Sequence, residues 1–120
     1  MAVVSATSKN AAAPIAPTAV ALATSGDTLN YIADQGQELW LYNTSGSDVV
    51  VTIDGSLGTT VPVPGGAGLT ASVAAGLAVT VVAGNFAVVM LDKAKAYLQG
   101  SVSITAATGA VVKATMVTLY

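Results

Sequence analysis

The sequence of 120 residues contains no cysteine and no histidine, and its only basic residues are four lysines. Without cysteine there is no disulfide and no thiolate ligand for a metal ion. Without histidine there is neither an imidazole ligand nor the usual base of a Ser-His or Cys-His nucleophile. Four lysines do not line a basic groove for nucleic acid. The composition therefore argues against most metal sites, nucleophilic hydrolases and nucleic-acid binding.

Charged side chains are also scarce. They make up 8% of the chain, with a net charge of -2, whereas an ordinary domain carries about 25%. The length suits one compact domain. A surface with so few charges leaves apolar patches that promote association. We therefore expect the chain to work inside an assembly and to form a homo-oligomer.

The distribution of apolar residues favours strands. They alternate with polar or small residues over 49–53, 77–82 and 101–105, which is the period of a half-buried strand. Turn-forming pairs such as Asp54-Gly55 and Thr108-Gly109 separate these segments at short intervals. Valine and threonine, both abundant, fit a pleated surface better than a helix. We expect an all-β fold, an antiparallel β-sandwich. The expected strands are 18–24, 28–33, 38–43, 49–53, 59–63, 68–73, 77–83, 86–91, 97–105 and 110–119.

Residues 1–17 differ from the rest of the chain. They are mostly alanine, serine and threonine with two prolines, and Ile15 is the one large side chain expected to matter for packing. Such a segment does not build a core of its own. We expect it to form an extended N-terminal arm on a β-sandwich domain of residues 18–120. Val3 and Val4 near its tip and Ile15 near its root are the expected contacts with a partner.

The longest uncharged stretch, residues 55–91, raises a membrane alternative. Its part from 69 to 91 is long enough for a spanning helix. Consecutive buried strands explain the stretch as well, because Gly76 and Gly84 fall where strand turns would and Thr80 falls on the polar beat. We therefore expect no membrane partner.

Two shorter segments carry local signals. Pro62 and Pro64 lack a backbone donor, so residues 59–63 form an edge strand or a connection. Residues 92–96 hold two lysines and an aspartate and are expected to form a short helical turn or an exposed loop.

The acidic residues do not form a recognisable site. They show no EF-hand spacing, and several lie at expected turns, where aspartate accepts hydrogen bonds from its own backbone. We expect no catalytic residue, no metal site and no cofactor, and the chain is not expected to be an enzyme. The six acids are Asp27, Asp34, Glu38, Asp48, Asp54 and Asp92.

The aromatic residues are more informative. Trp40 and Tyr42 share one face of the expected strand 38–43, and Leu39 and Leu41 share the other. One interpretation is that one face packs the core and the other covers a sheet edge. The other is that Trp40 or Tyr42 anchors a partner surface, as aromatic residues often do, or stacks on a sugar ring.

Seven segments, taken in order, resemble a known family. They are Gly26–Thr28, 33–46 (ADQGQELWLYNTSG), 49–53 (VVVTI), 73–76 (VAAG), 81–86 (VVAGNF), 100–105 (GSVSIT) and 111–116 (VVKATM). With this order and spacing, residues 18–119 resemble small virion proteins of tailed bacteriophages, namely capsid decoration (cement) and minor capsid proteins. The resemblance implies a jelly-roll-like β-sandwich at the capsid surface, bound to the major capsid protein. It also implies a trimer before a dimer, and no catalytic residue.

The sequence thus predicts a structural virion protein that binds and stabilises the outside of a phage capsid. A tail or head–tail junction component has the same kind of composition. A carbohydrate-binding module, with Trp40 and Tyr42 as a stacking platform, is the alternative from another class, followed by a holin-like membrane protein.

Overall fold

The computed structural model describes residues 3–8, 17–57, 60–62, 70–72 and 75–118, and the regular secondary structure in this part is almost entirely β-strand. The strands are β1 (Val3–Val4), β2 (Ala6–Ser8), β3 (Val20–Ala21), β4 (Asp27–Leu29), β5 (Glu38–Asn43), β6 (Val49–Gly55), β7 (Thr60–Pro62), β8 (Thr70–Ser72), β9 (Leu77–Val81), β10 (Phe86–Met90), β11 (Val102–Ala106) and β12 (Val112–Thr118). A short 3-10 helix, η1 (Leu91–Tyr97), links β10 to β11. The expected all-β class is confirmed, and each expected strand range overlaps one of these strands, whereas β1 and β2 were not expected.

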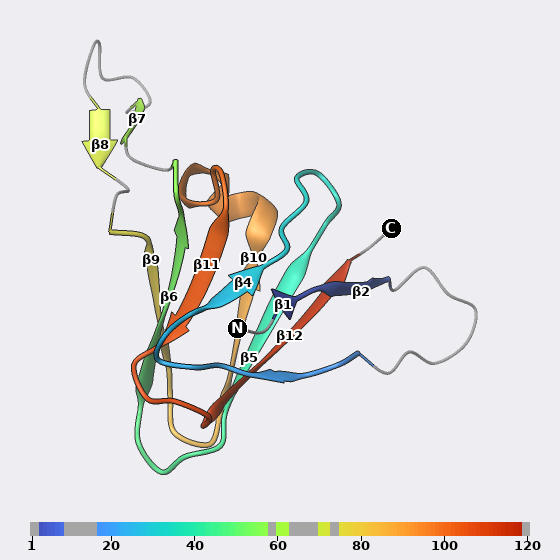
Figure 1. The fold of residues 1–120 in the computed structure, drawn as a ribbon, viewed down its shortest axis with the longest axis vertical. Coiled ribbons are helices and arrows are strands. Elements are labelled where there is room, and N and C mark those ends of the chain that lie inside the picture. Colours follow the sequence, from blue (N-terminus) through green and yellow to red (C-terminus); the bar gives the residue numbers. More distant parts are fainter. Residues whose placement is uncertain (1–2, 9–16, 58–59, 63–69, 73–74, 119–120) are drawn as a thin grey trace.

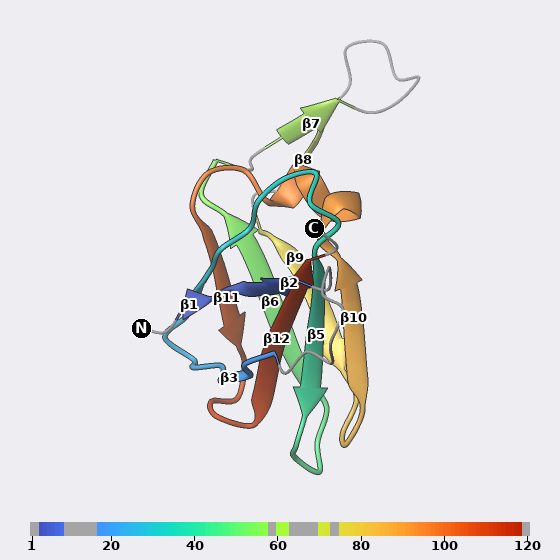
Figure 2. The same ribbon diagram turned by 90° about the vertical axis from the view of Figure 1, so that its right-hand side faces the viewer.

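The strands form two facing sheets, as expected for a sandwich (Figures 1 and 2). Sheet A has the order β1-β4-β11-β6-β9, and sheet B has the order β10-β5-β12-β2, with β3 also paired to β12. The strands β7 and β8 pair only with each other among the described strands and extend beyond one end of the sandwich (Figure 1). This agrees with the expectation that 59–63 is an edge strand or a connection.

The core between the sheets is aliphatic, because every second residue of each long strand points inward. Leu39 and Leu41 of β5 are fully buried, and they face Ile53 of β6 and Ile104 of β11 in one continuous cluster. Burying each such side chain stabilises the fold by about 1.5–3 kcal/mol. The period-2 pattern therefore sets both the strands and the face that each presents to the core.

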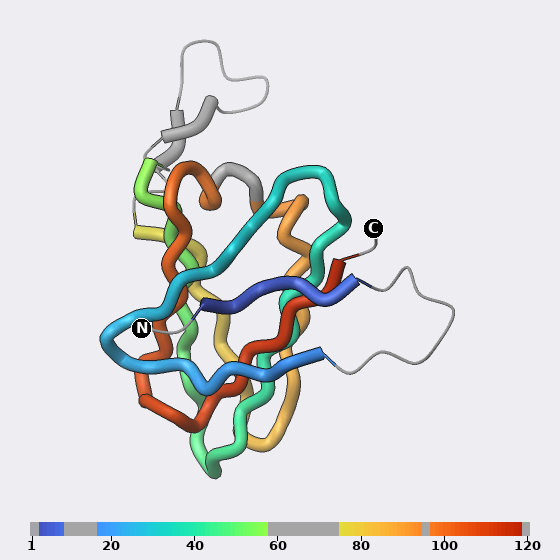
Figure 3. The backbone as a smooth tube through the Cα atoms, turned by 45° about the vertical axis from the view of Figure 1, so that its right-hand side comes forward, coloured from blue at the N-terminus to red at the C-terminus, as the bar shows by residue number. Residues whose placement is uncertain are grey.

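The N-terminal residues differ from the expected arm. Val3 pairs in parallel with Thr28 of β4, and Ala6 pairs in parallel with Met116 of β12. The segment 3–8 therefore crosses from sheet A to sheet B and covers one open side of the sandwich (Figures 2 and 3). Backbone pairing to two existing edges needs no large side chains, which is why the composition gave no signal. The two parallel pairs also make both sheets mixed, where purely antiparallel sheets were expected.

The uncharged stretch from 69 to 91 is not one helix. Its described part contains β8, β9 and β10. Among the described residues, no helix is long and apolar enough to cross a membrane.

Candidate docking surface

The outer face of sheet B carries an apolar surface centred on β5 and β10. The ladder pairs Phe86 with Tyr42, Val88 with Trp40, and Met90 with Glu38, so that facing residues point to the same side of the sheet. We call this surface the aromatic face. Its members are Glu38, Trp40, Tyr42, Phe86, Val88 and Met90.

Three rings on the aromatic face pack against one another and stay open to solvent. Tyr42 stacks on Phe86 with ring centroids 4.5 Å apart and planes inclined by 22°. Trp40 meets Phe86 edge to face at 6.4 Å and 78°. Even so, Phe86 is 64% exposed and Trp40 is 41% exposed. The rings therefore hold one another in place and leave much of their area free for a partner.

The polar end of the tryptophan is already engaged. Trp40 Nε1 donates a hydrogen bond of 3.2 Å to Glu38 Oε2, which fixes the indole ring and leaves its apolar area outward. An open pocket of about 370 Å³ lies beside the Trp40 ring. Its lining residues are Pro17, Glu38, Trp40, Phe86, Thr115 and Val117. This is an apolar hollow with one carboxylate at its margin.

The sequence predicted part of this surface. Leu39 and Leu41 are in the core while Trp40 and Tyr42 point outward, as the alternation indicated. Trp40 and Tyr42 lie on an interior strand, because β5 lies between β10 and β12 in sheet B, and they pack against Phe86 of the edge strand β10. Phe86 was not predicted to be part of this surface. Its strand is apolar at every position, so no alternation of polar and apolar residues shows which side faces outward.

The expected contacts at the N-terminus are not brought together with the aromatic face. Val4 is 1% exposed and belongs to the core, so its assignment as a partner contact is wrong: a residue already buried in its own fold offers no surface. Val3 is 55% exposed, on the outermost strand of sheet A. Ile15 lies outside the described residues.

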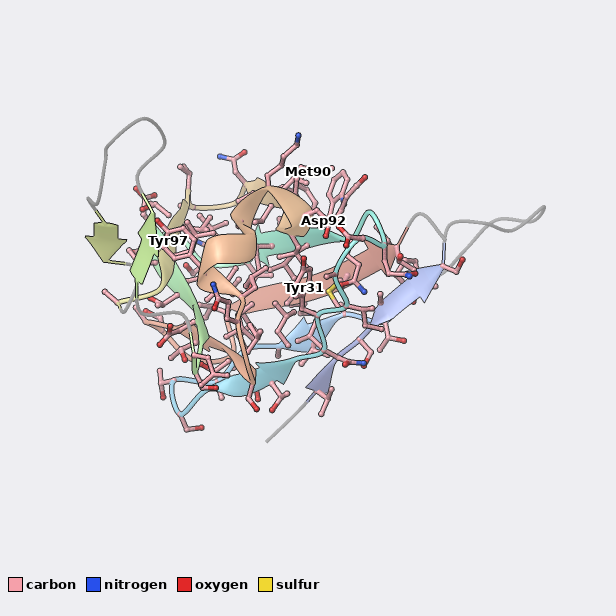
Figure 4. All side chains as sticks on the ribbon, turned by 90° about the horizontal axis from the view of Figure 1, so that it is seen from above. Tyr31, Met90, Asp92 and Tyr97 are labelled. Carbon is pink, nitrogen blue, oxygen red and sulfur yellow. The ribbon has the colours of Figure 1, made fainter. Side chains whose placement is uncertain are left out.

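Asp92 of η1 has a structural role. Its Oδ1 accepts hydrogen bonds from the Tyr31 hydroxyl at 2.9 Å and from the Asp34 backbone N–H at 3.1 Å. Its Oδ2 accepts the Gly36 N–H at 3.0 Å. Figure 4 labels Tyr31 and Asp92 and shows them near η1. Burial, followed by the hydrogen bond to Asp92, raises the pKa of Tyr31, so the phenol keeps its proton and its hydrogen bond to Asp92 at neutral pH.

Asn43 is a second structural residue, at the end of β5. Its Nδ2 donates to the backbone carbonyls of Ser47 at 2.7 Å and Val81 at 2.9 Å. Its Oδ1 accepts from the backbone N–H and the hydroxyl of Ser45. The buried amide is therefore fully satisfied, and through Val81 it ties sheet B to sheet A.

Within the described part of the chain, no three acidic side chains gather as ligands for a metal ion. No family model, no curated protein and no solved structure matches this chain.

Proposed function

We propose that the chain is a structural virion protein of a tailed phage that binds the outside of the capsid and stabilises it. The observation that carries the proposal is the aromatic face: three mutually packed, exposed rings on a sheet whose other face is the core. Exposed tryptophan, tyrosine, phenylalanine and methionine are enriched where proteins bind one another. The resemblance supplies the partner, the major capsid protein.

The face is well suited to binding because it is already ordered. The stacking of Tyr42 on Phe86 and the hydrogen bond from Trp40 to Glu38 restrict the side chains before a partner arrives. Binding then loses little rotamer freedom, which is a major opposing term in association. On a capsid, many copies add avidity to a modest contact at each site.

The jelly-roll-like connectivity, the position at the capsid surface and the homo-oligomer all belong to this proposal. They rest on the family resemblance and on the low charge of the chain. A tail or head–tail junction role would use the same face on a different virion protein.

Carbohydrate binding is the second candidate, favoured by a specific observation. Phe86 and Trp40 line an open pocket beside the Glu38 carboxylate, and a sugar can stack on a ring while its hydroxyls donate to a carboxylate. This candidate differs in its ligand but uses the same residues.

The test is cosedimentation with capsids of the phage that carries this chain, prepared without it. The wild-type chain should saturate the capsids at a fixed stoichiometry, and Trp40→Ala should weaken binding at least tenfold. Val50→Ala is the matched control, because Val50 is 42% exposed on the outer face of sheet A, and it should bind as the wild type does. Equal weakening by both substitutions, or no saturable binding, would contradict the proposal. Retardation in polysaccharide gels without capsid binding would favour the carbohydrate candidate.

A further inference from the structure

The strand β10 is the outermost strand of sheet B on the side away from β2 (Figure 2). The opposite side of the sandwich is covered by β1 and β2, which pair with both sheets. Among the strands that the structure describes, none pairs with the outer edge of β10. One side of the molecule is thus closed by its own chain, while the side formed by β10 is open.

The hydrogen bonds at the two ends of β10 show which backbone groups face outward. The Asn43 N–H donates to the Asn85 carbonyl at 3.0 Å, and the Leu91 N–H donates to the Gln37 carbonyl at 3.1 Å. In an antiparallel ladder, residues that bond to the neighbouring strand alternate with residues that point away. Odd-numbered residues therefore bond to β5, and Phe86, Val88 and Met90 direct their N–H and C=O groups to the open edge.

This edge lacks the usual protection against pairing with another chain. Natural edge strands carry lysine, proline, a bulge or a very short length. The β10 sequence Phe-Ala-Val-Val-Met has neither charge nor proline, and its register with β5 is unbroken over five residues. The neighbouring edge of sheet A, β9, presents the small outward residues Ala78 and Thr80, so pairing there would bury less apolar area.

We propose that β10 pairs with β10 of a second copy of this chain, antiparallel about a two-fold axis at Val88. This register places Val88 opposite Val88 of the second copy, and Phe86 opposite Met90. Each of these facing pairs exchanges both of its backbone hydrogen bonds.

The edge is self-complementary, which is why the occupant is a second copy rather than another protein. Phe86 and Met90 lie two residues on either side of Val88, and a methionine sulfur packs favourably against an aromatic ring. The strand contains no charged residue, so no like charges meet across the two-fold axis. A two-fold contact uses the same surface on both copies, so it closes and does not propagate into a fibre.

The dimer has a consequence for the aromatic face. The two B sheets would become one continuous sheet, with the rings of both copies on the same side. This contact produces a dimer, whereas the family resemblance implied a trimer before a dimer. The inference stands on the edge alone and does not depend on capsid binding.

Cysteine cross-linking tests the register, because the chain has no cysteine of its own. Facing residues of a hydrogen-bonded pair lie about 5.5 Å apart at Cα, within the range that a disulfide bridges. Under mild oxidation Val88→Cys should form a covalent dimer. Phe86→Cys alone and Met90→Cys alone should not, while a mixture of the two should. The matched control is Val50→Cys, at 42% exposure against 45% for Val88, and it should stay monomeric on the denaturing gel.

Light scattering on the unmodified chain gives an independent reading that requires no variant to fold. A dimer mass is expected, and Val88→Lys should convert it to a monomer while Val50→Lys leaves it unchanged. A monomeric or trimeric mass for the unmodified chain would overturn the proposal. Cross-linking at Val50 as fast as at Val88, or no cross-linking of the mixed pair, would overturn it as well.

Discussion

The outer faces of the two sheets show how the same alternation produces two different surfaces. On sheet A most outward residues of β4, β6 and β11 are hydroxylated, as in the facing pairs Thr105 with Thr52 and Ser103 with Thr28, with Val50 as an apolar exception. On sheet B the corresponding positions of β5 and β10 hold three rings, a valine and a methionine. Both faces lie over mostly aliphatic inward residues, which are buried in β5, β6 and β11 and partly buried in β10. The core therefore does not explain the difference, and the aromatic face is the one with area suited to a partner.

The largest expected effect concerns Asn43, whose buried amide ties sheet B to sheet A. Asn43→Ala would remove the donor to the buried carbonyl of Val81 and the acceptor of the Ser45 N–H, while the Ser47 carbonyl would keep its hydrogen bond from the Ser45 hydroxyl. We expect the free energy of unfolding to fall by about 3–5 kcal/mol, since each orphaned buried group costs about 1–3 kcal/mol. Denaturant unfolding measures this. The control is Asn85→Ala, whose exposed amide makes a bond of 3.3 Å to Ala83 and whose loss should change stability by less than about 0.5 kcal/mol.

The next effect comes from making sheet B resemble sheet A. Trp40→Thr combined with Tyr42→Thr removes two rings from an interior strand and keeps its β propensity. Because central aromatic anchors are each worth about 2 kcal/mol or more, we expect capsid binding to fall by roughly 1,000-fold. Thermal unfolding should change little by comparison, since both side chains are exposed. Thr52→Ser with Thr105→Ser on sheet A is the control, and a similar loss of binding there would remove the distinction between the faces.

A smaller effect is expected at η1, where the chain passes from sheet B to sheet A. Asp92→Asn removes the charge and one of the two carboxylate oxygens that accept from Tyr31, Asp34 and Gly36. We expect a loss of about 2 kcal/mol in the free energy of unfolding, because hydrogen bonds to charged acceptors contribute about 1.5–3 kcal/mol. Hydrogen exchange should show the loss as faster exchange of the Asp34 and Gly36 amides. Unchanged exchange there would show that Asp92 does not hold this loop.

The smallest effect is a dependence on alkaline pH. The pKa of Tyr31 is raised in the folded chain by burial and by its bond to Asp92. The folded state therefore keeps this proton at a pH where the unfolded chain releases it, above about 10. Its contribution to stability is complete below that pH and is lost as the pH rises further. Unfolding free energies of the wild type and Tyr31→Phe should run parallel below pH 9 and converge above pH 10. Parallel curves up to pH 11 would contradict this.

The sequence predicted the elements whose pattern is local. The strand 38–43 was placed with its observed bounds, because leucines and aromatic residues alternate in it without a break. The charged segment 92–96 was expected to be a helical turn or loop, and it lies within η1. Both depend on neighbouring residues alone.

What the sequence did not predict depends on partners far along the chain. The pairing of Val3 with Thr28 and of Ala6 with Met116 uses backbone groups, which every residue has, so no side-chain pattern marks it. Phe86 joins the aromatic face only through its register with Tyr42. The same holds for Asn43, whose partners Ser47 and Val81 come together only in the fold.

The parallel pairing of β2 with β12 also determines how the protein responds to mechanical load. One strand lies near the start of the chain and the other near its end, with Ala6, Thr7 and Ser8 beside Met116, Val117 and Thr118. Because the two strands run in the same direction, tension between the chain ends pulls them along each other. The ladder is then loaded in shear, with its bonds sharing the force, whereas an antiparallel terminal pair would open one bond at a time. If the chain binds a capsid as proposed, such a clamp would help it resist tension between its ends.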